Sequence, residues 1–216
     1  SFHLLEELIK AAGREGVSNF PIHIKIDTGM HRLGFAPEEI PALVDRLHRQ
    51  SAVIPRSVFS HLVGSDAERF DSFTRRQIET FENASAELQA GFSHKILRHI
   101  CNTAGIERYP GAQFDMVRLG IGLYGIDPFT NKILHNVGTL KTTILQIHDV
   151  PADETVGYSR KGILTRNSRI AAIPIGYADG LNRHLGNGNA YCLVNGQKAP
   201  YVGNICMDVC MIDVTD

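Results

Sequence analysis

The chain has 216 residues, of which 43% are hydrophobic and 21% charged, and its formal net charge at pH 7 is -1. This composition is typical of a soluble globular protein with a sizeable core, and no apolar run is long enough to span a membrane. The charge balance provides no basic surface for binding nucleic acid.

The cysteines and histidines form no pattern that indicates a metal or redox site. Cys101, Cys192, Cys206 and Cys210 include no C-x-x-C pair, and the ten histidines show no ligand spacing such as H-E-x-x-H. We therefore expect no metal ion and a reducing, cytoplasmic compartment. At Cys206 and Cys210 we expect thiols that pack as small hydrophobic side chains.

The first part of the chain alternates between helical and strand-like patterns. Apolar residues recur at helical spacing in residues 4–9, in 40–47 after Pro37, and in 70–88. Four short apolar runs suit strands, at residues 22–26, 58–63, 96–100 and 116–119. Strands that alternate with helices are parallel, so we predict an α/β fold containing half of a (β/α)8 TIM-type barrel.

Polar residues gather where the predicted strands end. In a barrel of parallel strands the chemistry lies at these ends. The residues in question are Lys25, Asp27, Arg32, His61, Asn102, Thr103, Arg118 and Gly120. The sequence therefore predicts a functional site at this end of the barrel.

After about residue 135 the helical patterns fade and strands dominate. Asn195-Gly196 predicts a tight hairpin turn, because both residue types tolerate positive φ. The predicted strands cover residues 140–147, 170–175, 191–194, 201–202 and 205–214. We therefore place a barrel segment at residues 1–134 and an incomplete C-terminal β-domain at 135–216.

Four strands make only half a barrel, which leaves one edge and one face open. The chain also stops directly after a predicted strand. We expect either that the chain is part of a longer polypeptide, cut at both ends, or that another element covers the gap.

Seven segments resemble those of the alanine racemases, in order and in spacing. They are IKIDTGMHRLGF (24–35), SHLVGSD (60–66), CNTAG (101–105), FDMVRLGIGLYG (114–125), TVGYSRKG (155–162), IPIGYADGLNR (173–183) and VGNICMD (202–208). The last two are the most specific, since related barrels also occur in amino-acid decarboxylases that use pyridoxal phosphate. The resemblance covers essentially the whole chain and implies fold type III, with the last four strands of a cofactor-binding barrel before the β-domain.

The resemblance implies a pyridoxal 5'-phosphate cofactor and the racemisation of L-alanine to D-alanine for peptidoglycan of the cell wall. In this family the cofactor is held as a Schiff base on a lysine at the end of the first barrel strand, which this chain lacks. That lysine is one base, and Tyr158 matches the other. Racemisation needs a base on each face, because a single fixed base would return the proton to the face it left. The tyrosine comes from the partner's β-domain, which implies a head-to-tail homodimer.

The resemblance also implies cofactor-binding roles for five residues. His61 and Arg118 match a network that reaches the tyrosine, and Arg118 matches the arginine that faces the pyridine nitrogen. Since arginine stays charged, that nitrogen should stay unprotonated, which weakens the electron sink and limits side reactions such as transamination. Thr103, Gly120 and Ile121 match phosphate-binding positions, where Thr103 keeps the hydroxyl of the commoner serine.

Arg32 and Met207 match residues that bind the substrate carboxylate, Met207 through its backbone N–H. Lys25 matches a lysine that is often carbamylated in this family, where the added negative charge positions the arginine. Pairing of an unmodified Lys25 with Asp27 or another carboxylate is the alternative, because an unpaired buried charge is costly. If residues 205–214 form a strand, Met207 and Asp208 face opposite sides, so only one can point into the site.

Tyr177, Asp66 and Arg183 match the corridor by which substrate reaches the site. Asn204 stands where an arginine is frequent, which changes the charge of this corridor and with it the substrate range.

Other functions remain open. The parent protein could racemise serine, lysine or several amino acids. The chain could instead be a non-catalytic fragment, because without the missing lysine it lacks the cofactor attachment and one base. It could also derive from a bifunctional ligase–racemase of cell-wall synthesis.

Overall fold

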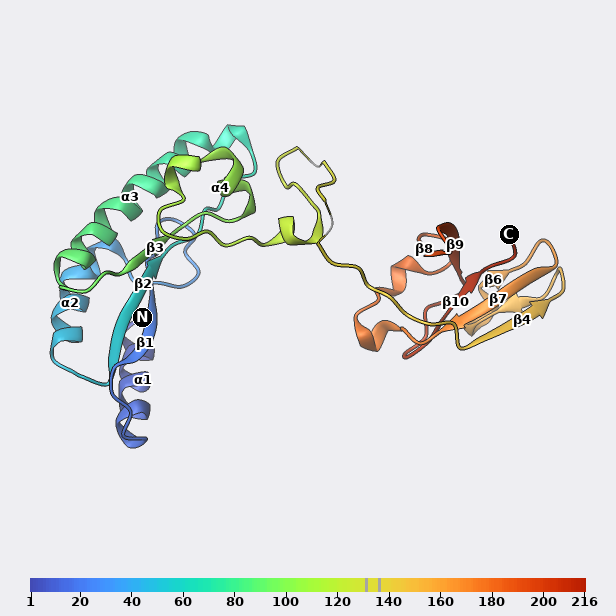
Figure 1. Ribbon diagram of the computed structural model, residues 1–216, viewed down its shortest axis with the longest axis horizontal. Coiled ribbons are helices and arrows are strands. Elements are labelled where there is room, and N and C mark those ends of the chain that lie inside the picture. The colour runs from blue at the N-terminus through green and yellow to red at the C-terminus, as the bar shows by residue number, and fades with distance from the viewer. Residues whose placement is uncertain (131, 136) are drawn as a thin grey trace. The chain divides into compact units, whose positions relative to one another are not determined.

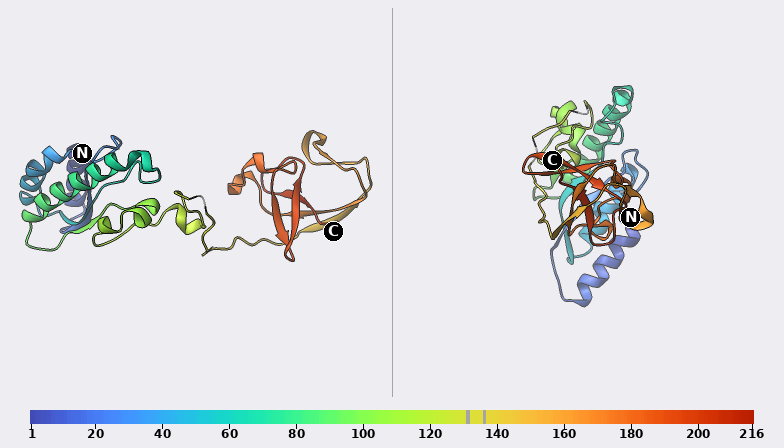
Figure 2. Two further views of the ribbon diagram at one scale, coloured as in Figure 1. Left: turned by 90° about the horizontal axis from the view of Figure 1, so that it is seen from above. Right: turned by 90° about the vertical axis from the view of Figure 1, so that its right-hand side faces the viewer.

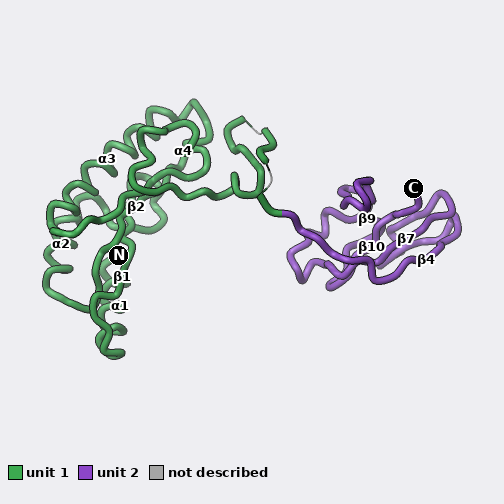
Figure 3. Tube along the Cα trace, in the orientation of Figure 1, with its two compact units in different colours: residues 1–138 green, residues 139–216 purple. Residues whose placement is uncertain are grey.

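The computed structural model describes residues 1–130, 132–135 and 137–216. The chain divides into two compact units, residues 1–138 (unit 1) and 139–216 (unit 2), which Figure 3 shows in different colours. The boundary between the units follows residue 138, whereas the sequence predicted a boundary after residue 134. Each unit is described below by itself.

Unit 1 combines helices with a parallel sheet. In chain order its helices and strands are α1 (Phe2–Arg14), β1 (Phe20–Lys25), α2 (Ile40–His48), β2 (Val53–Phe59), α3 (Asp71–Ala90), β3 (Leu97–His99) and α4 (Thr103–Arg108). Short 3-10 helices cover Pro37–Glu39, Glu68–Phe70, Pro110–Ala112 and Ile121–Tyr124. The strands pair in parallel in the order β1-β2-β3, and Figure 1 shows α2 and α3 beside them.

The helical and strand patterns of the sequence account for the core of unit 1. On α2 the buried residues Ile40, Leu43 and Leu47 recur at helical spacing, and the Glu39 carboxylate caps the preceding turn by accepting the Ala36 N–H at 2.7 Å. On the sheet and on α3, apolar side chains complete the same cluster, among them Ile22, Ile24, Val58, Phe81 and Leu88.

The predicted strand at residues 116–119 is wrong. The segment lies beside β3, where Asp115 N–H donates to Arg98 O at 3.1 Å and Arg118 N–H donates to Cys101 O at 3.0 Å. These contacts do not continue into a strand ladder. The described part of unit 1 therefore holds three parallel strands, and the predicted set of four is not formed.

Unit 2 is built from antiparallel strands. They are β4 (Gln146–Val150), β5 (Thr155–Val156), β6 (Gly162–Ile163), β7 (Ser168–Ile173), β8 (Tyr191–Val194), β9 (Gln197–Val202) and β10 (Cys210–Asp213). Five form a sheet in the order β4-β7-β10-β9-β8, and β5 pairs with β6. Figure 2 shows these strands, in yellow-orange to red, from two further directions. The core includes Ala171, Ile173, Tyr201, Ile205 and Ile212.

The predicted hairpin is confirmed. Val194 pairs with Gln197, and between them Asn195 and Gly196 have φ of 50° and 82°. Two positive φ angles in a two-residue loop match the right-handed twist of the flanking strands.

Two predicted strands of unit 2 are shorter than expected. Residues 140–145 lie outside β4, and residues 205–209 form a turn in which Cys206 N–H donates to Val209 O at 3.0 Å. Met207 and Asp208 therefore do not alternate along a strand, and the prediction that they face opposite sides of one is wrong. The turn is held from elsewhere in the chain, since Cys206 O accepts the Tyr177 N–H at 3.0 Å and Met207 O accepts the Ala178 N–H at 2.9 Å.

The four cysteines carry no disulfide. Burial raises the pKa of Cys101 to about 11 and that of Cys210 to about 12, so both thiols stay protonated and unreactive. Cys206 is only partly buried.

Across the described residues, the structure contains no helix both long and apolar enough to cross a membrane.

Candidate active site

A pocket of about 450 Å³ lies in unit 1, next to the segments that follow β2 and β3. It also contacts residues 118–121, which run beside the end of β3. The predicted site residues that line it are His61, Asp66, Thr103, Arg118, Gly120 and Ile121. The structure thus brings together all five predicted cofactor-binding residues, two from the segments that follow parallel strands and three from the segment beside them.

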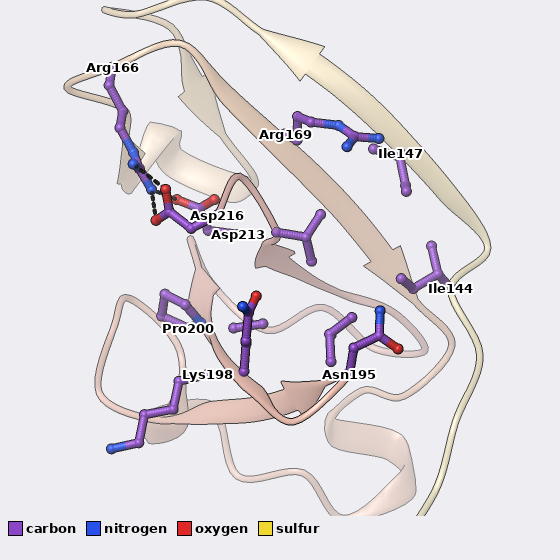
Figure 4. Close-up of a pocket in the computed structure, with 13 residues that line it drawn as sticks. Ile144, Ile147, Arg166, Arg169, Asn195, Lys198, Pro200, Asp213 and Asp216 are labelled. Carbon is purple, nitrogen blue, oxygen red and sulfur yellow. Dashed lines mark hydrogen bonds and ion pairs between the residues drawn. The ribbon is translucent and has the colours of Figure 1, made fainter.

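A larger pocket, of about 620 Å³, lies in unit 2 (Figure 4). The predicted site residues are not among those that line it. Its most prominent cation, Arg166, is already paired with Asp216 at 2.6 Å. The residues for which the sequence predicts cofactor binding therefore line the smaller pocket.

Arg118 is held at the pocket of unit 1 by neutral acceptors. Its Nη1 donates to His99 Nδ1 at 2.6 Å and to His99 O at 3.2 Å. Its Nη2 donates to Ser60 O at 2.6 Å and to Ile100 O at 3.3 Å, and lies 3.5 Å from His61 Nδ1. These contacts fix the plane of the guanidinium, and in the described part of the chain its positive charge has no carboxylate partner.

His99 is a site residue that the sequence analysis missed. It is buried, and burial followed by the charges of Arg118 and His23 lowers its pKa to about 4. Because Nδ1 accepts from Arg118, the hydrogen-bond partners assign the ring proton to Nε2, which donates to Ser57 Oγ at 3.2 Å. The Ser57 hydroxyl in turn contacts His23 Nδ1. A histidine within the apolar run 96–100 was the available signal.

His61 is half-buried at the pocket. Burial lowers its pKa first, followed by the positive charges of Arg118, Arg32 and Lys25. The imidazole is therefore neutral at pH 7 and can hold or pass a proton beside Arg118.

Lys25 and Arg32 add two more cations beside His61. Burial, and after it the charge of Arg32, lowers the pKa of Lys25, whose ammonium lies 5.9 Å from the Phe59 ring centre. In the part of the chain that the structure describes, Asp27 pairs with His31, at 3.9 Å, and not with Lys25.

Asp27 serves instead to shape the turn that leads to Arg32. Its Oδ1 accepts the backbone N–H groups of Gly29, Met30 and His31 at 2.9, 3.0 and 3.1 Å. The alternative of an ion pair between Lys25 and Asp27 is therefore not formed, and carbamylation of Lys25 stays a prediction.

Thr103, Gly120 and Ile121 form a small cradle at the start of α4. The Thr103 hydroxyl oxygen accepts the N–H groups of Gly120 at 3.0 Å and Gly122 at 3.2 Å. A Cβ on Gly122 would lie 2.7 Å from Thr103 Cγ2, so the close approach requires glycine. The Thr103 hydroxyl proton and the Ile121 N–H face no acceptor in the described residues. Such donors beside the charge of Arg118 fit the oxygens of a phosphate.

Tyr158 lies in unit 2, directly after Gly157, whose φ of 77° turns the chain. The side chain is 70% exposed. Its backbone O accepts from Asn204 Nδ2 at 3.2 Å, so the residue that replaces the expected arginine anchors the tyrosine segment. Tyr158 is therefore largely open to solvent.

The other predicted residues of unit 2 lie around the turn at residues 205–209. Met207 is 54% exposed at the tip of this turn. The Arg183 guanidinium carbon lies 5.5 Å from the Tyr177 ring centre, so these two predicted corridor residues are neighbours. Asp66, the third, belongs to unit 1.

Comparisons with known proteins identify the family. Residues 1–128 match the family described as alanine racemase, N-terminal domain, and residues 137–216 match alanine racemase, C-terminal domain. Alanine racemase 1 of Clostridium acetobutylicum is 40% identical over 222 residues, which cover 100% of this chain and 57% of that protein. The alanine racemase of Aeromonas hydrophila is 39% identical over 197 residues, covering 88% of this chain and 53% of that protein.

Solved structures agree with these matches. The alanine racemase of Clostridium difficile 630 superposes with a TM-score of 0.79 at 29% identity, covering 100% of this chain and 57% of that one. The alanine racemase of Bartonella henselae, solved with covalently bound pyridoxal phosphate, gives a TM-score of 0.68 at 31% identity, covering 100% and 58%. The chain thus spans a little over half the length of its relatives. The sequence-based prediction is confirmed: the chain belongs to the alanine racemase family.

Proposed function

We propose that the protein containing this chain is a pyridoxal-phosphate-dependent alanine racemase that works in the cytoplasm and supplies D-alanine for peptidoglycan. The observation that carries the proposal is the pocket of unit 1, which His61, Thr103, Arg118, Gly120 and Ile121 line together. The covalently bound pyridoxal phosphate of the Bartonella henselae relative supports the choice of cofactor.

The cofactor would be held by the cradle and by Arg118. Thr103 and Ile121 would bind its phosphate through the Thr103 hydroxyl proton and the Ile121 N–H, and Gly120, whose N–H donates to Thr103 Oγ1, would lie against the phosphate. Arg118 would hold its pyridine nitrogen, and the neutral partners of Arg118 leave its charge available for this contact. When bound, pyridoxal phosphate supplies an electron sink for the pair left when alanine loses its α-proton.

Two bases would move the α-proton, one on each face of alanine. Tyr158 is the base that this chain contributes, and the exposure of its side chain supports this role. The second base is a lysine outside this chain. Arg32 and the backbone N–H of Met207 would bind the substrate carboxylate and so orient the α-proton. A carbamylated Lys25 would position Arg32.

We further propose a head-to-tail homodimer, in which Tyr158 and Met207 of one subunit complete the pocket of the other. Tyr177, Arg183 and Asp66 would then line the corridor to the site. The proximity of Tyr177 and Arg183 within unit 2 supports the corridor in part.

Exchange of the α-proton with D2O tests the two-base proposal. The full-length protein with pyridoxal phosphate should racemise alanine and exchange the α-proton of both enantiomers. Tyr158→Phe should abolish racemisation, while one enantiomer still exchanges because the lysine on its face remains. Loss of exchange for both enantiomers in this variant would contradict separate bases.

Two further measurements distinguish the alternatives. Faster turnover of serine or lysine than of alanine by the full-length protein would assign a different substrate. An intact mass of 23.8 kDa would mean that the mature protein consists of this chain alone. Such a protein should show no racemase activity.

A further inference from the structure

Gln77 is a buried amide that uses all of its hydrogen-bonding groups on two loops. It lies on α3 and is 1% exposed. Its Nε2 donates to His61 O at 3.1 Å and to Thr28 Oγ1 at 3.2 Å. Its Oε1 accepts the Val63 N–H at 3.1 Å. The side chain thus contacts the backbone on both sides of Leu62.

These contacts replace a strand partner for the segment after β2. Strand β2 ends at Phe59, and beyond it, among the described residues, His61 O and Val63 N–H have no backbone partner beside buried Leu62. An unpaired polar group in such a place costs free energy, so the amide of Gln77 selects one path for this segment. That path carries His61 to the pocket.

Gln77 also links this segment to the turn that leads to Arg32. The Thr28 hydroxyl that receives its N–H lies 2.8 Å from Ser60 Oγ, and Ser60 O accepts from Arg118 Nη2 at 2.6 Å. One side chain outside the pocket lining therefore connects the segments of Arg32, His61 and Arg118.

We propose that Gln77 is a positioning residue that holds His61 at the pocket beside Arg118. The proposal rests on the proposed function in that His61 belongs to the cofactor site. Gln77 itself touches neither cofactor nor substrate and acts through the backbone of residues 61–63.

Gln89 provides a matched control on the same helix. Its Nε2 donates to Phe92 O at 3.1 Å and to His94 O at 2.9 Å, and its Oε1 accepts the Ile96 N–H at 2.8 Å. Like Gln77 it donates two hydrogen bonds and accepts one, but all three go to the backbone of the loop that enters β3, at the opposite end from the pocket. Gln89→Met therefore removes the same number of bonds without touching the His61 segment.

The first experiment is an NMR pH titration of the His61 ring in full-length, cofactor-free protein. Burial and the charges of Arg118, Arg32 and Lys25 lower the pKa of His61. In Gln77→Met the His61 imidazole should move out of its buried position and away from these positive charges. Its pKa should therefore rise toward the ordinary value. Gln89→Met should leave the titration unchanged. This readout needs no catalysis, so it stands even if the protein racemises another amino acid or none.

The second experiment compares racemase kinetics of the loaded protein. Gln77→Met should lower kcat about tenfold or more, because small misplacements of catalytic groups are costly, with a smaller change in KM for alanine. Gln89→Met should retain kcat. An unchanged His61 titration in folded Gln77→Met, or equal effects of both variants, would overturn the proposal. If Gln77→Met does not fold, the isosteric Thr28→Val serves as a second variant, because it removes the hydrogen bond between Gln77 and Thr28. Thr28→Val should also raise the pKa of His61. An unchanged pKa of His61 in this variant would overturn the proposal.

Discussion

The contacts of Arg118 depend on the protonation state of His99. Nδ1 of His99 accepts from the guanidinium, and a protonated ring would offer only donors to it. His99 therefore has to stay neutral, and its burial in β3 and the charge of Arg118 favour the neutral form.

His99 makes the stability of unit 1 depend on pH. Its folded pKa of about 4 lies below the ordinary value of 6.5. Between these values the unfolded chain binds more protons, so stability rises with pH: the contribution is complete above pH 6.5 and is lost as pH falls toward 4. The shift corresponds to about 3 kcal/mol. Unfolding free energies measured from pH 7 to 4 should fall less steeply in His99→Asn, and an NMR titration of His99 near pH 6.5 would contradict the assignment.

The hydroxyl of Thr103 should matter more than its methyl group. Thr103→Val removes the acceptor for the N–H groups of Gly120 and Gly122 and loosens the cradle. We expect the Kd for pyridoxal phosphate to rise about tenfold, which is the usual effect of losing a hydrogen bond of about 1.4 kcal/mol. Equilibrium dialysis of the full-length protein measures it. Thr103→Ser keeps the hydroxyl and should bind normally, and equal affinity in both variants would refute this account.

At the residue scale, sequence motifs predicted the residues that line the pocket, and missed those that support them. His61, Thr103 and Arg118 lie within recognisable motifs. His23, Ser57, Gln77 and His99 lie inside ordinary strand and helix patterns, and their role depends on contacts between segments far apart in the chain. Periodicity cannot reveal such contacts.

Among the elements, those whose pattern is complete within their own segment were predicted well. The helix over residues 70–88 corresponds to α3, and residues 191–194 are β8. Residues 116–119 and 205–209 have apolar patterns typical of strands, yet they form no strand, because partners elsewhere take up their backbone groups.

Gly176 shows most directly that the turn at residues 205–209 depends on contacts with a distant part of the chain. A Cβ at this position would lie 2.1 Å from Met207 O, so only glycine allows the turn at residues 205–209 to approach. Gly176→Ala should break the bonds from Tyr177 N–H and Ala178 N–H to the turn and destabilise unit 2 by about 3 kcal/mol. Thermal unfolding measures the loss. Gly138→Ala, where a Cβ meets nothing within 4 Å, should be nearly neutral, and equal melting of the two variants would show that the turn can move.

At the scale of the whole molecule, the motifs predicted the family, and the barrel was overcounted by one strand. Motifs are local and survive in a chain that spans about 57% of a relative. The number of paired strands depends on neighbours along the sheet, and residues 115–119 make two backbone bonds to residues 98–101 without forming a ladder.

Subunit mixing tests the proposed dimer. If Tyr158 of one subunit serves the pocket of the other, a mixed dimer of Tyr158→Phe and Arg118→Ala has one intact site and one doubly altered site. Equal mixing after dissociation should restore about one quarter of the wild-type activity from two inactive proteins, because half of the dimers are mixed. Activity that stays absent after verified exchange of subunits would place both residues in the same subunit's site.

The cluster of Lys25, Arg32 and Arg118 has a consequence for the response to ionic strength. Folding brings these like charges together around His61, while the carboxylate of Asp27 is engaged by backbone N–H groups. Dissolved salt shortens the range of their repulsion from about 30 Å at 10 mM to about 8 Å at 150 mM. Salt weakens most surface ion pairs, but here it should relieve a repulsion. Unit 1 without cofactor should therefore melt at a higher temperature in 150 mM sodium chloride than in 10 mM.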